Sequence, residues 1–276
     1  MYSAEISRSN PSCFLFIIDQ SGSMSDPFGA GSKAGSVSDA INRLLQNLII
    51  KCAKSEGIRD YYHVGVIGYG ATVGPAFGGA LAGKELVPIS EIADHPTRLE
   101  KRAKKIPDGA GGLVDQIVKF PVWFDPVANG GTPMCKAMNT AHTILSQWIG
   151  EYPQCFPPVV IHITDGESND GDPTAAMEQI RDLSTDDGNV LLFNLHISGN
   201  PNAVELRFPE TSDELPDKYS RMLYDNSSIL TPFMIWVANQ EYQLNLSDGA
   251  RGFVLNADLT LVIQALDIGT RPANLR

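Results

Sequence analysis

The chain has 276 residues, which is long for one α/β domain but short for two complete ones. A chain of this length buries roughly three quarters of its unfolded surface, so it needs no disulfides to be stable. Its net charge of −11 and its pI near 4.8 argue against nucleic acid or an anionic membrane as the partner of most of its surface. No stretch has the length of a membrane span, and residues 1–10 contain no apolar run typical of a signal peptide.

The four cysteines, Cys13, Cys52, Cys135 and Cys155, have neither C-x-x-C spacing nor the density of a disulfide framework. We therefore expect free and mostly buried thiols, as in proteins of a reducing compartment. This cysteine usage favours a cytoplasmic protein.

An uninterrupted apolar run, residues 14–18, ends at the carboxylate of Asp19. Such a run predicts a strand that is buried on both faces of a parallel sheet. Ser21 and Ser23 follow at alternate positions, where the strand reaches the carboxyl edge at which open α/β sheets bind ligands. One carboxylate and two hydroxyls are hard oxygen donors, which suit Mg²⁺ or Mn²⁺.

A helix and a second strand come next. From about Val37 apolar residues recur at helical spacing, and Ser36 or Ser38 is a candidate N-cap. The expected buried face of this helix contains Ile41, Leu44, Leu45, Leu48, Ile49 and Cys52. Residues 61–70 predict the second strand, and the glycines there miss the G-x-G-x-x-G spacing of a dinucleotide site.

The segment 71–129 is an enlarged insertion with a basic run. We expect a strand at 84–89, a helix at 98–106, a flexible loop at 108–112 and an apolar stretch at 118–124. The basic run contains Arg98, Lys101, Arg102, Lys104 and Lys105. It is either a solvated helix face or a docking patch for an acidic or phosphorylated partner. Three later residues either rim the candidate site or pack an edge strand: Trp123, Phe124 and Asp125.

A third hydroxyl and a second carboxylate complete the candidate site. Two glycines place Thr132 on a tight turn, and Pro133 suits the first turn of the helix that follows. Residues 159–164 predict another buried strand, which ends at Asp165. The polar loop after it either shapes metal selectivity or is simply solvated, and it contains Glu167, Asn169, Asp170 and Asp172.

The remaining segments alternate between helix and strand patterns. We expect helices at 174–183, 214–224, 232–240 and 259–266, strands at 190–197 and 252–255, and an edge segment at 200–209. Three histidines interior to strands, His63, His162 and His196, are interpreted as structural. The alternation predicts one α/β domain over 1–276, with a doubly wound, mostly parallel sheet, helices on both faces and one antiparallel edge strand. A helical elaboration is expected at about 200–245.

Three motifs follow one another in the chain: Asp19-x-Ser21-x-Ser23, then Thr132 after a glycine pair, then Thr164-Asp165-Gly166 at a strand end. Together they resemble the metal-ion-dependent adhesion site of von Willebrand factor type A domains. All five motif positions match, and the resemblance covers most of the chain. It implies that Mg²⁺ or Mn²⁺ is held by Asp19, Ser21, Ser23, Thr132 and Asp165. The three hydroxyls would bind the ion directly, and the two carboxylates directly or through water.

The resemblance implies a metal-dependent protein-interaction module, whose ion binds an Asp or Glu carboxylate of a partner protein. The chain looks like the intracellular, stand-alone type A proteins of bacteria, which are often associated with Ser/Thr kinases and phosphatases or with AAA-type ATPases, and its size resembles the first group more. One alternative is a structural subunit with a non-functional site. The other is a Mg²⁺-dependent hydrolase or phosphatase, although haloacid dehalogenase-type sites need Asp where Ser21 stands and the chain has no G-x-S-x-G turn.

Overall fold

The computed structural model describes residues 2–107, 112–200 and 202–272. Its central sheet has the strand order β15-β16-β14-β11-β1-β6-β7, with β8 also paired to β6. Five strands are parallel: β1 (Ser12–Asp19), β6 (Tyr62–Tyr69), β11 (Val159–Thr164), β14 (Leu191–Ile197) and β16 (Phe253–Ala257). Three short strands are antiparallel: β7 (Val73–Pro75), β8 (Val87–Pro88) and β15 (Leu206–Arg207). The doubly wound α/β class is confirmed, with antiparallel strands at both edges instead of one.

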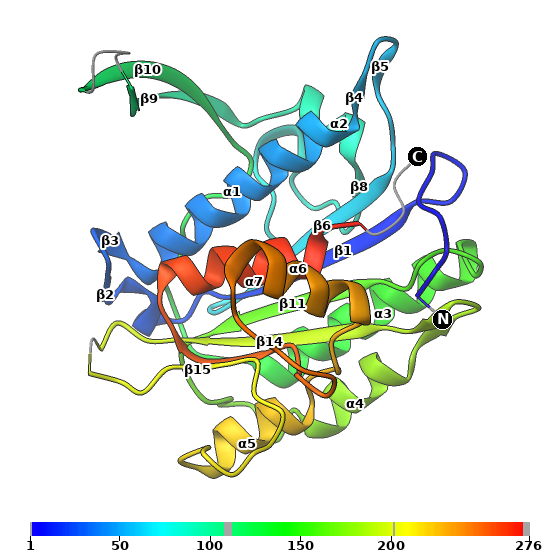
Figure 1. The fold of residues 1–276 in the computed structure, drawn as a ribbon, viewed down its shortest axis with the longest axis vertical. Helices are drawn as coiled ribbons and strands as arrows, with labels where there is room; N and C mark the ends of the chain where they lie inside the picture. Colours follow the sequence, from blue (N-terminus) through cyan, green and yellow to red (C-terminus); the bar gives the residue numbers. More distant parts are fainter. Residues whose placement is uncertain (1, 108–111, 201, 273–276) are drawn as a thin grey trace.

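Helices cover both faces of this sheet (Figure 1). On one side lie α1 (Lys33–Cys52), α2 (Ile89–Asp94), α6 (Pro232–Tyr242) and α7 (Leu259–Thr270). On the other lie α3 (Met134–Glu151), α4 (Thr174–Asp182) and α5 (Lys218–Asp225). Within the part of the chain that the structure describes, no helix is both long and apolar enough to cross a membrane.

Strand β1 separates two hydrophobic cores. Phe14, Phe16 and Ile18 pack with the α1 side, whereas the alternate residues Leu15 and Ile17 pack with the α3 side. The whole strand is buried, as the apolar run predicts. All four cysteines are free thiols, and three of them are buried.

Helix α1 begins earlier than its apolar pattern predicts. Its N-cap is Ser32, whose hydroxyl accepts a hydrogen bond from the backbone N–H of Gly35 at 3.1 Å. The two expected caps have other partners, because the Ser36 hydroxyl donates to the Phe28 carbonyl and the Ser38 hydroxyl to the Phe124 carbonyl. Five of the six residues expected on the buried face are buried, and Ile49 is partly buried.

The segment expected to be a basic helix is instead one strand of a long hairpin. Strand β9 (Arg98–Pro107) pairs antiparallel with β10 (Leu113–Val122), and we name this hairpin the arm. Figure 1 shows the arm projecting from the body beyond α1. The helix prediction was wrong because a run of charges carries no periodicity of its own, whereas burial along β10 alternates from Val118 to Phe120 and Val122. The predicted loop at 108–112 lies, except for Gly112, outside the described residues.

The bounds of several other helices and strands also differ from those expected from the sequence. The expected strand at 84–89 shrinks to β8, because α2 starts directly after Pro88. Helix α5 starts only at Lys218, because Asp217 forms a capping box there. Short hairpins join Pro27–Phe28 to Gly31–Ser32 (β2, β3), Ala53–Lys54 to Gly57–Ile58 (β4, β5) and Ser184–Thr185 to Gly188–Asn189 (β12, β13). Two 3₁₀ turns occupy Gly22–Ser25 (η1) and Gly79–Leu81 (η2).

Residues at the foot of the arm pack inside the protein. The Trp123 indole is buried and donates to the Ile92 carbonyl at 2.5 Å. Phe124 is buried as well, and its backbone N–H donates to the Asn42 side chain. Asp125 pairs with Arg98 at 2.7 Å. Of the two interpretations offered by the sequence, packing at an edge strand therefore describes Trp123, Phe124 and Asp125 better than rimming of the candidate site.

Arg102 joins the arm to the body. Its guanidinium donates two hydrogen bonds of 2.9 Å to the two carboxylate oxygens of Asp39 on α1. It also pairs with Glu100 at 2.7 Å and lies 3.7 Å from the centre of the Phe120 ring. Two of the five residues of the basic run are thus used internally, since Arg98 and Arg102 are both ion-paired.

We expect Arg102→Ala to loosen the arm while leaving the sheet intact. The loss of the bidentate pair, in which Arg102 is 30% and Asp39 48% exposed, and of the ring contact should lower stability by about 1 kcal/mol. Hydrogen exchange of the β9 and β10 amides measures the effect, and their protection should fall. Lys101→Ala is the matched control, because Lys101 is exposed and lies on the opposite face of β9. Equal protection in Arg102→Ala and Lys101→Ala would contradict the assignment.

A buried polar chain crosses the sheet beneath its carboxyl edge. The His162 ring is fully buried, and its Nε2 lies 2.7 Å from the Tyr69 hydroxyl and its Nδ1 2.9 Å from Asn194 Oδ1. Asn194 continues the chain by donating to the Leu223 carbonyl. Both ring nitrogens are therefore occupied, which agrees with a structural role for His162.

Burial lowers the pKa of His162 to about 4, against an ordinary 6.5. The unfolded chain therefore binds the proton more tightly, so stability present above pH 6.5 should be lost as the pH falls toward 4. The full contribution is about 3 kcal/mol at 1.36 kcal/mol per pH unit. Chemical denaturation at a series of pH values gives the free energy of unfolding as a function of pH. Its slope between pH 6.5 and 4 should be smaller for His162→Gln than for the wild type. The exposed His95→Gln is the control, and an unchanged slope in His162→Gln would refute the prediction.

Candidate metal centre

Three loops meet at the carboxyl edge of the sheet, where the strand order changes direction at β1. The loop after β1 bonds to the loop before α3 through Gly22 N–H to the Gly130 carbonyl (3.0 Å) and Asn129 N–H to the Gln20 carbonyl (2.6 Å). The loop after β11 joins through Asn169 N–H to the Thr132 carbonyl (3.0 Å). These backbone bonds bring the three parts of the motif together.

The turn that carries Thr132 requires glycines. Gly130 has φ +88°, and a Cβ there would lie 2.4 Å from the Ala71 backbone nitrogen. A Cβ on Gly131 would lie 2.1 Å from the Asn169 side chain. The glycine pair thus lets the loop approach both neighbours closely enough to place Thr132 between them.

Asp19 lies at the base of the site with no exposed surface. One carboxylate oxygen accepts from the Ser21 backbone N–H and the other from the Thr164 hydroxyl, both at 2.8 Å. Burial raises the pKa of Asp19, the hydrogen bonds from Ser21 and Thr164 lower it in part, and the charge of Asp165 raises it further. A cation bound to this carboxylate would therefore offset both the energetic cost of burying its charge and its repulsion by Asp165.

Ser21, Ser23 and Asp165 form one hydrogen-bonded cluster. The two serine hydroxyls lie 3.0 Å apart, and the Ser23 hydroxyl donates to Asp165 Oδ1 at 2.7 Å. The fifth predicted residue, Thr132, bonds to the loop after β11 through its carbonyl, which accepts from the Asn169 N–H. Within the described part of the chain, Thr132 makes no hydrogen bond to the cluster, and its hydroxyl makes no hydrogen bond.

Lys33 also reaches this site, although the sequence reasoning missed it. Its ammonium lies 2.7 Å from Asp165 Oδ2 and 3.3 Å from Asp26 Oδ2. The sequence contains one signal, because a lysine directly after the cap Ser32 places a positive charge at a helix N-terminus.

Two carboxylates of the acidic loop after β11, those of Asp170 and Asp172, bond to the starts of helices. Asp170 accepts from the backbone N–H groups of Cys135 (2.9 Å) and Lys136 (3.0 Å) at the start of α3. Burial alone would raise the pKa of Asp170, but these bonds hold it below its ordinary value. Asp172 accepts from the Thr174 N–H at the start of α4.

The donor set suits a hard divalent ion. Among the described residues, no three carboxylate, imidazole or thiol groups gather where they could share an ion. An ion at this edge would therefore depend on hydroxyl oxygens together with Asp19 and Asp165, which fits Mg²⁺ or Mn²⁺ and not a soft metal.

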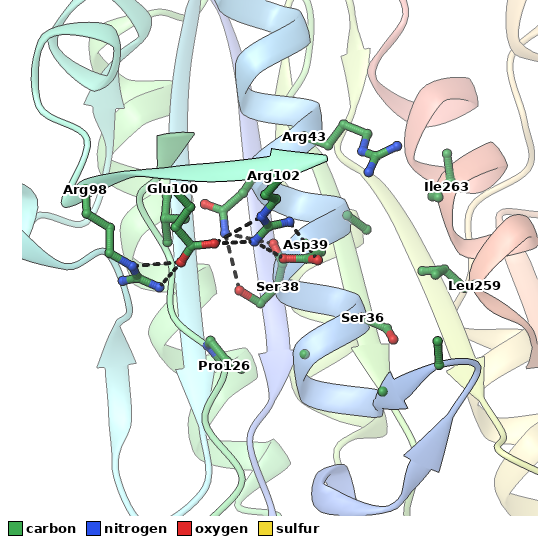
Figure 2. A pocket seen from close by; sticks show the side chains of 16 residues that line it. Ser36, Ser38, Asp39, Arg43, Arg98, Glu100, Arg102, Pro126, Leu259 and Ile263 are labelled. Atoms are coloured by element: carbon green, nitrogen blue, oxygen red, sulfur yellow. Dashed lines mark hydrogen bonds and ion pairs between the residues drawn. The ribbon is translucent and has the colours of Figure 1, made fainter. Parts of the chain in front are cut away.

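A groove of about 490 Å³ lies between the first half of α1, the base of the arm and the start of α7 (Figure 2). Figure 2 shows the ion-paired side chains of the arm on one side, and Leu259 and Ile263 of α7 on the other. Arg43 points toward the α7 side, is exposed and has no ion-pair partner in the described ranges. Gly31 lines the end of the groove, two residues before Lys33.

No protein-family model and no curated protein sequence matches the chain. Solved structures match its fold. A von Willebrand factor type A protein from Catenulispora acidiphila is 18% identical, over 68% of this chain and 34% of its own, with a TM-score of 0.42. Proximal thread matrix protein 1 from the mussel byssus is 13% identical, over 96% and 49%, at 0.50. The manganese-loaded TRAP protein of Plasmodium vivax is 14% identical, over 95% and 74%, at 0.43.

These likenesses concern the fold alone, and the chain spans a third to a half of the length of the first two matched chains. The strand order and the helices on both faces give the chain a doubly wound, Rossmann-like α/β fold, and a von Willebrand factor type A protein is among the solved structures that it resembles.

Proposed function

We propose that the chain is a metal-dependent protein-recognition module of the von Willebrand factor type A family. It binds one Mg²⁺ or Mn²⁺ at Asp19, Ser21, Ser23, Thr132 and Asp165. The observation that carries this proposal is the hydrogen-bonded cluster of Ser21, Ser23 and Asp165, which the Ser21 backbone N–H joins to the buried Asp19.

The chemistry of such a site is recognition of a carboxylate. A bound divalent ion supplies an electrophilic position that accepts an Asp or Glu oxygen of a partner. Two protein carboxylates balance the ion, and neutral hydroxyls leave it able to attract a further anion. The chain's own part is to fix these oxygens: Thr164 and the Ser21 N–H orient Asp19, and Ser23 orients Asp165.

One coordination bond is too weak to select a partner, so surrounding surface must supply affinity and specificity. The groove beside α1 offers Arg43 together with apolar surface from Leu259 and Ile263, and its lining includes Gly31, two residues before Lys33. We propose that the partner is a cytoplasmic protein, with a Ser/Thr kinase or phosphatase as the first class to test. Residues 1–276 act as one domain in this account, and neither nucleic acid nor a membrane is a partner.

Affinity capture with and without EDTA tests this function. The wild-type chain loaded with Mn²⁺ and the Ser23→Ala variant are used as baits, and captured proteins are identified by mass spectrometry. We expect a partner that is retained by the wild type, lost in EDTA and lost with Ser23→Ala. A partner that binds equally well under all three conditions would contradict a metal-bridged contact.

We propose that the chain is not an enzyme. No proton-transfer base is available from His162, which lies beneath the site with both ring nitrogens hydrogen-bonded. His196, near Asp165, is engaged through Nδ1 with the Asn256 N–H. Hydrolysis of p-nitrophenyl phosphate in Mg²⁺ should equal that of Asp19→Ala, and metal-dependent turnover by the wild type alone would overturn this view.

A further inference from the structure

Lys33 is a buried cation built into the candidate metal centre. Its side chain is 9% exposed, and the carboxylate it contacts, Asp165, has no exposed side-chain surface. Both oxygens of Asp165 are occupied, one by the Ser23 hydroxyl and the other by the Lys33 ammonium at 2.7 Å. Asp26, the second partner of Lys33, is 58% exposed and so contributes less to its charge balance.

The position of Lys33 has an energetic cost within its own helix. It is the first residue of α1, where the helix dipole and unpaired N–H groups disfavour a positive charge. Desolvation of the ammonium adds to that cost. The backbone of Gly199 also lies close, since a Cβ there would be 3.8 Å from Lys33 Cε. Asp165 compensates these costs, so the pair is specific and not a chance surface contact.

We infer that Lys33 tunes the metal centre: it lowers the affinity of the site for the divalent ion and leaves the bound ion more attractive to an incoming carboxylate. This inference rests on the proposed function. Asp19 and Asp165 together neutralise a divalent ion, and Lys33 adds a third positive charge that repels the ion. The same surplus charge attracts the partner's carboxylate, so Lys33 exchanges metal affinity for ligand affinity. In the absence of the ion, Lys33 is the group that neutralises Asp165.

Titration with Mn²⁺ tests the first part. Lys33→Met keeps the apolar stem and removes the charge, and Lys33→Arg keeps the charge. We expect Lys33→Met to bind Mn²⁺ roughly tenfold more tightly or better than the wild type, and Lys33→Arg to stay close to it. Asp26→Asn is a further control that leaves the contact with Asp165 intact. If the wild type binds Mn²⁺ and Lys33→Met binds it equally or more weakly, the inference is wrong.

Thermal melting in EDTA separates charge tuning from simple packing. Without Lys33, Asp165 is a buried carboxylate that has lost its cation, so Lys33→Met should melt about 5 °C or more below the wild type. Saturating Mn²⁺ should restore most of that loss. A variant that is less stable with and without Mn²⁺ would show that Lys33 only supports packing. If the wild type does not bind Mn²⁺, the proposed function is wrong. If Lys33→Met binds Mn²⁺ tightly in that case, the result still supports the inference that Lys33 lowers the affinity of the site for the ion.

Discussion

Asp19→Ala should abolish binding of Mn²⁺ or Mg²⁺, with a loss of affinity on the order of 100-fold or more. Asp19 is the only carboxylate at the base of the site within the described residues, and its hydrogen bonds also fix the Ser21 loop. The variant removes charge and loop order together. Isothermal titration of chelated protein measures the result, and the wild type should show one site per chain.

The control for this variant is Asp172→Ala. It removes the same charge from an exposed loop position, where, among the described residues, Asp172 hydrogen-bonds only to Thr174. Its affinity for Mn²⁺ should match the wild type, because exposed charges are screened at physiological salt. Retained binding in Asp19→Ala would remove Asp19 from the site, and equal losses in both variants would indicate a general charge effect.

Asp19→Asn should change stability in opposite directions with and without the ion. In EDTA we expect a free energy of unfolding no lower than that of the wild type, within about 1 kcal/mol. The amide oxygen can accept from the Ser21 N–H, and the amide N–H can donate to Thr164, whose hydroxyl then donates to the Gly166 carbonyl at 3.0 Å. Burial raises the pKa of Asp19, and so does the charge of Asp165; the neutral amide removes both costs.

In saturating Mn²⁺ the order should reverse, because only the intact site gains stability from the ion. That gain is about 2.7 kcal/mol at a concentration 100 times the dissociation constant. Chemical denaturation of both proteins, with EDTA and with Mn²⁺, provides the four values. A large loss of stability for Asp19→Asn in EDTA would mean that the charged carboxylate itself holds the loops together.

Much of the fold was predictable because several central strands are short, mainly apolar runs that end at polar residues. The run before Asp19 and the run before Asp165 predicted buried strands of a parallel sheet, and in the structure these two strands are neighbours. A parallel pair brings its carboxyl ends to one edge, so the grouping of Ser21, Ser23 and Asp165 followed.

The arm and Lys33 depend on information that local patterns lack. Five positive charges in 98–105 have no intrinsic helical or strand period, and their structure is fixed by pairing with β10 and by the Arg102–Asp39 contact. Lys33 reaches Asp165 across 132 positions of the chain, a distance in sequence that no local pattern bridges. The docking hypothesis for the basic run now concerns Lys101 and Lys105, because these two residues lie on the face of β9 opposite to the paired Arg102.

Anomalous diffraction from crystals of the protein grown with Mn²⁺ would test the central claim most directly. The account predicts one manganese peak per chain, bounded by Asp19, Ser21, Ser23, Thr132 and Asp165, with the Lys33 ammonium still near Asp165. A peak at the Asp170 loop, or no peak at a concentration that saturates the titration, would contradict it.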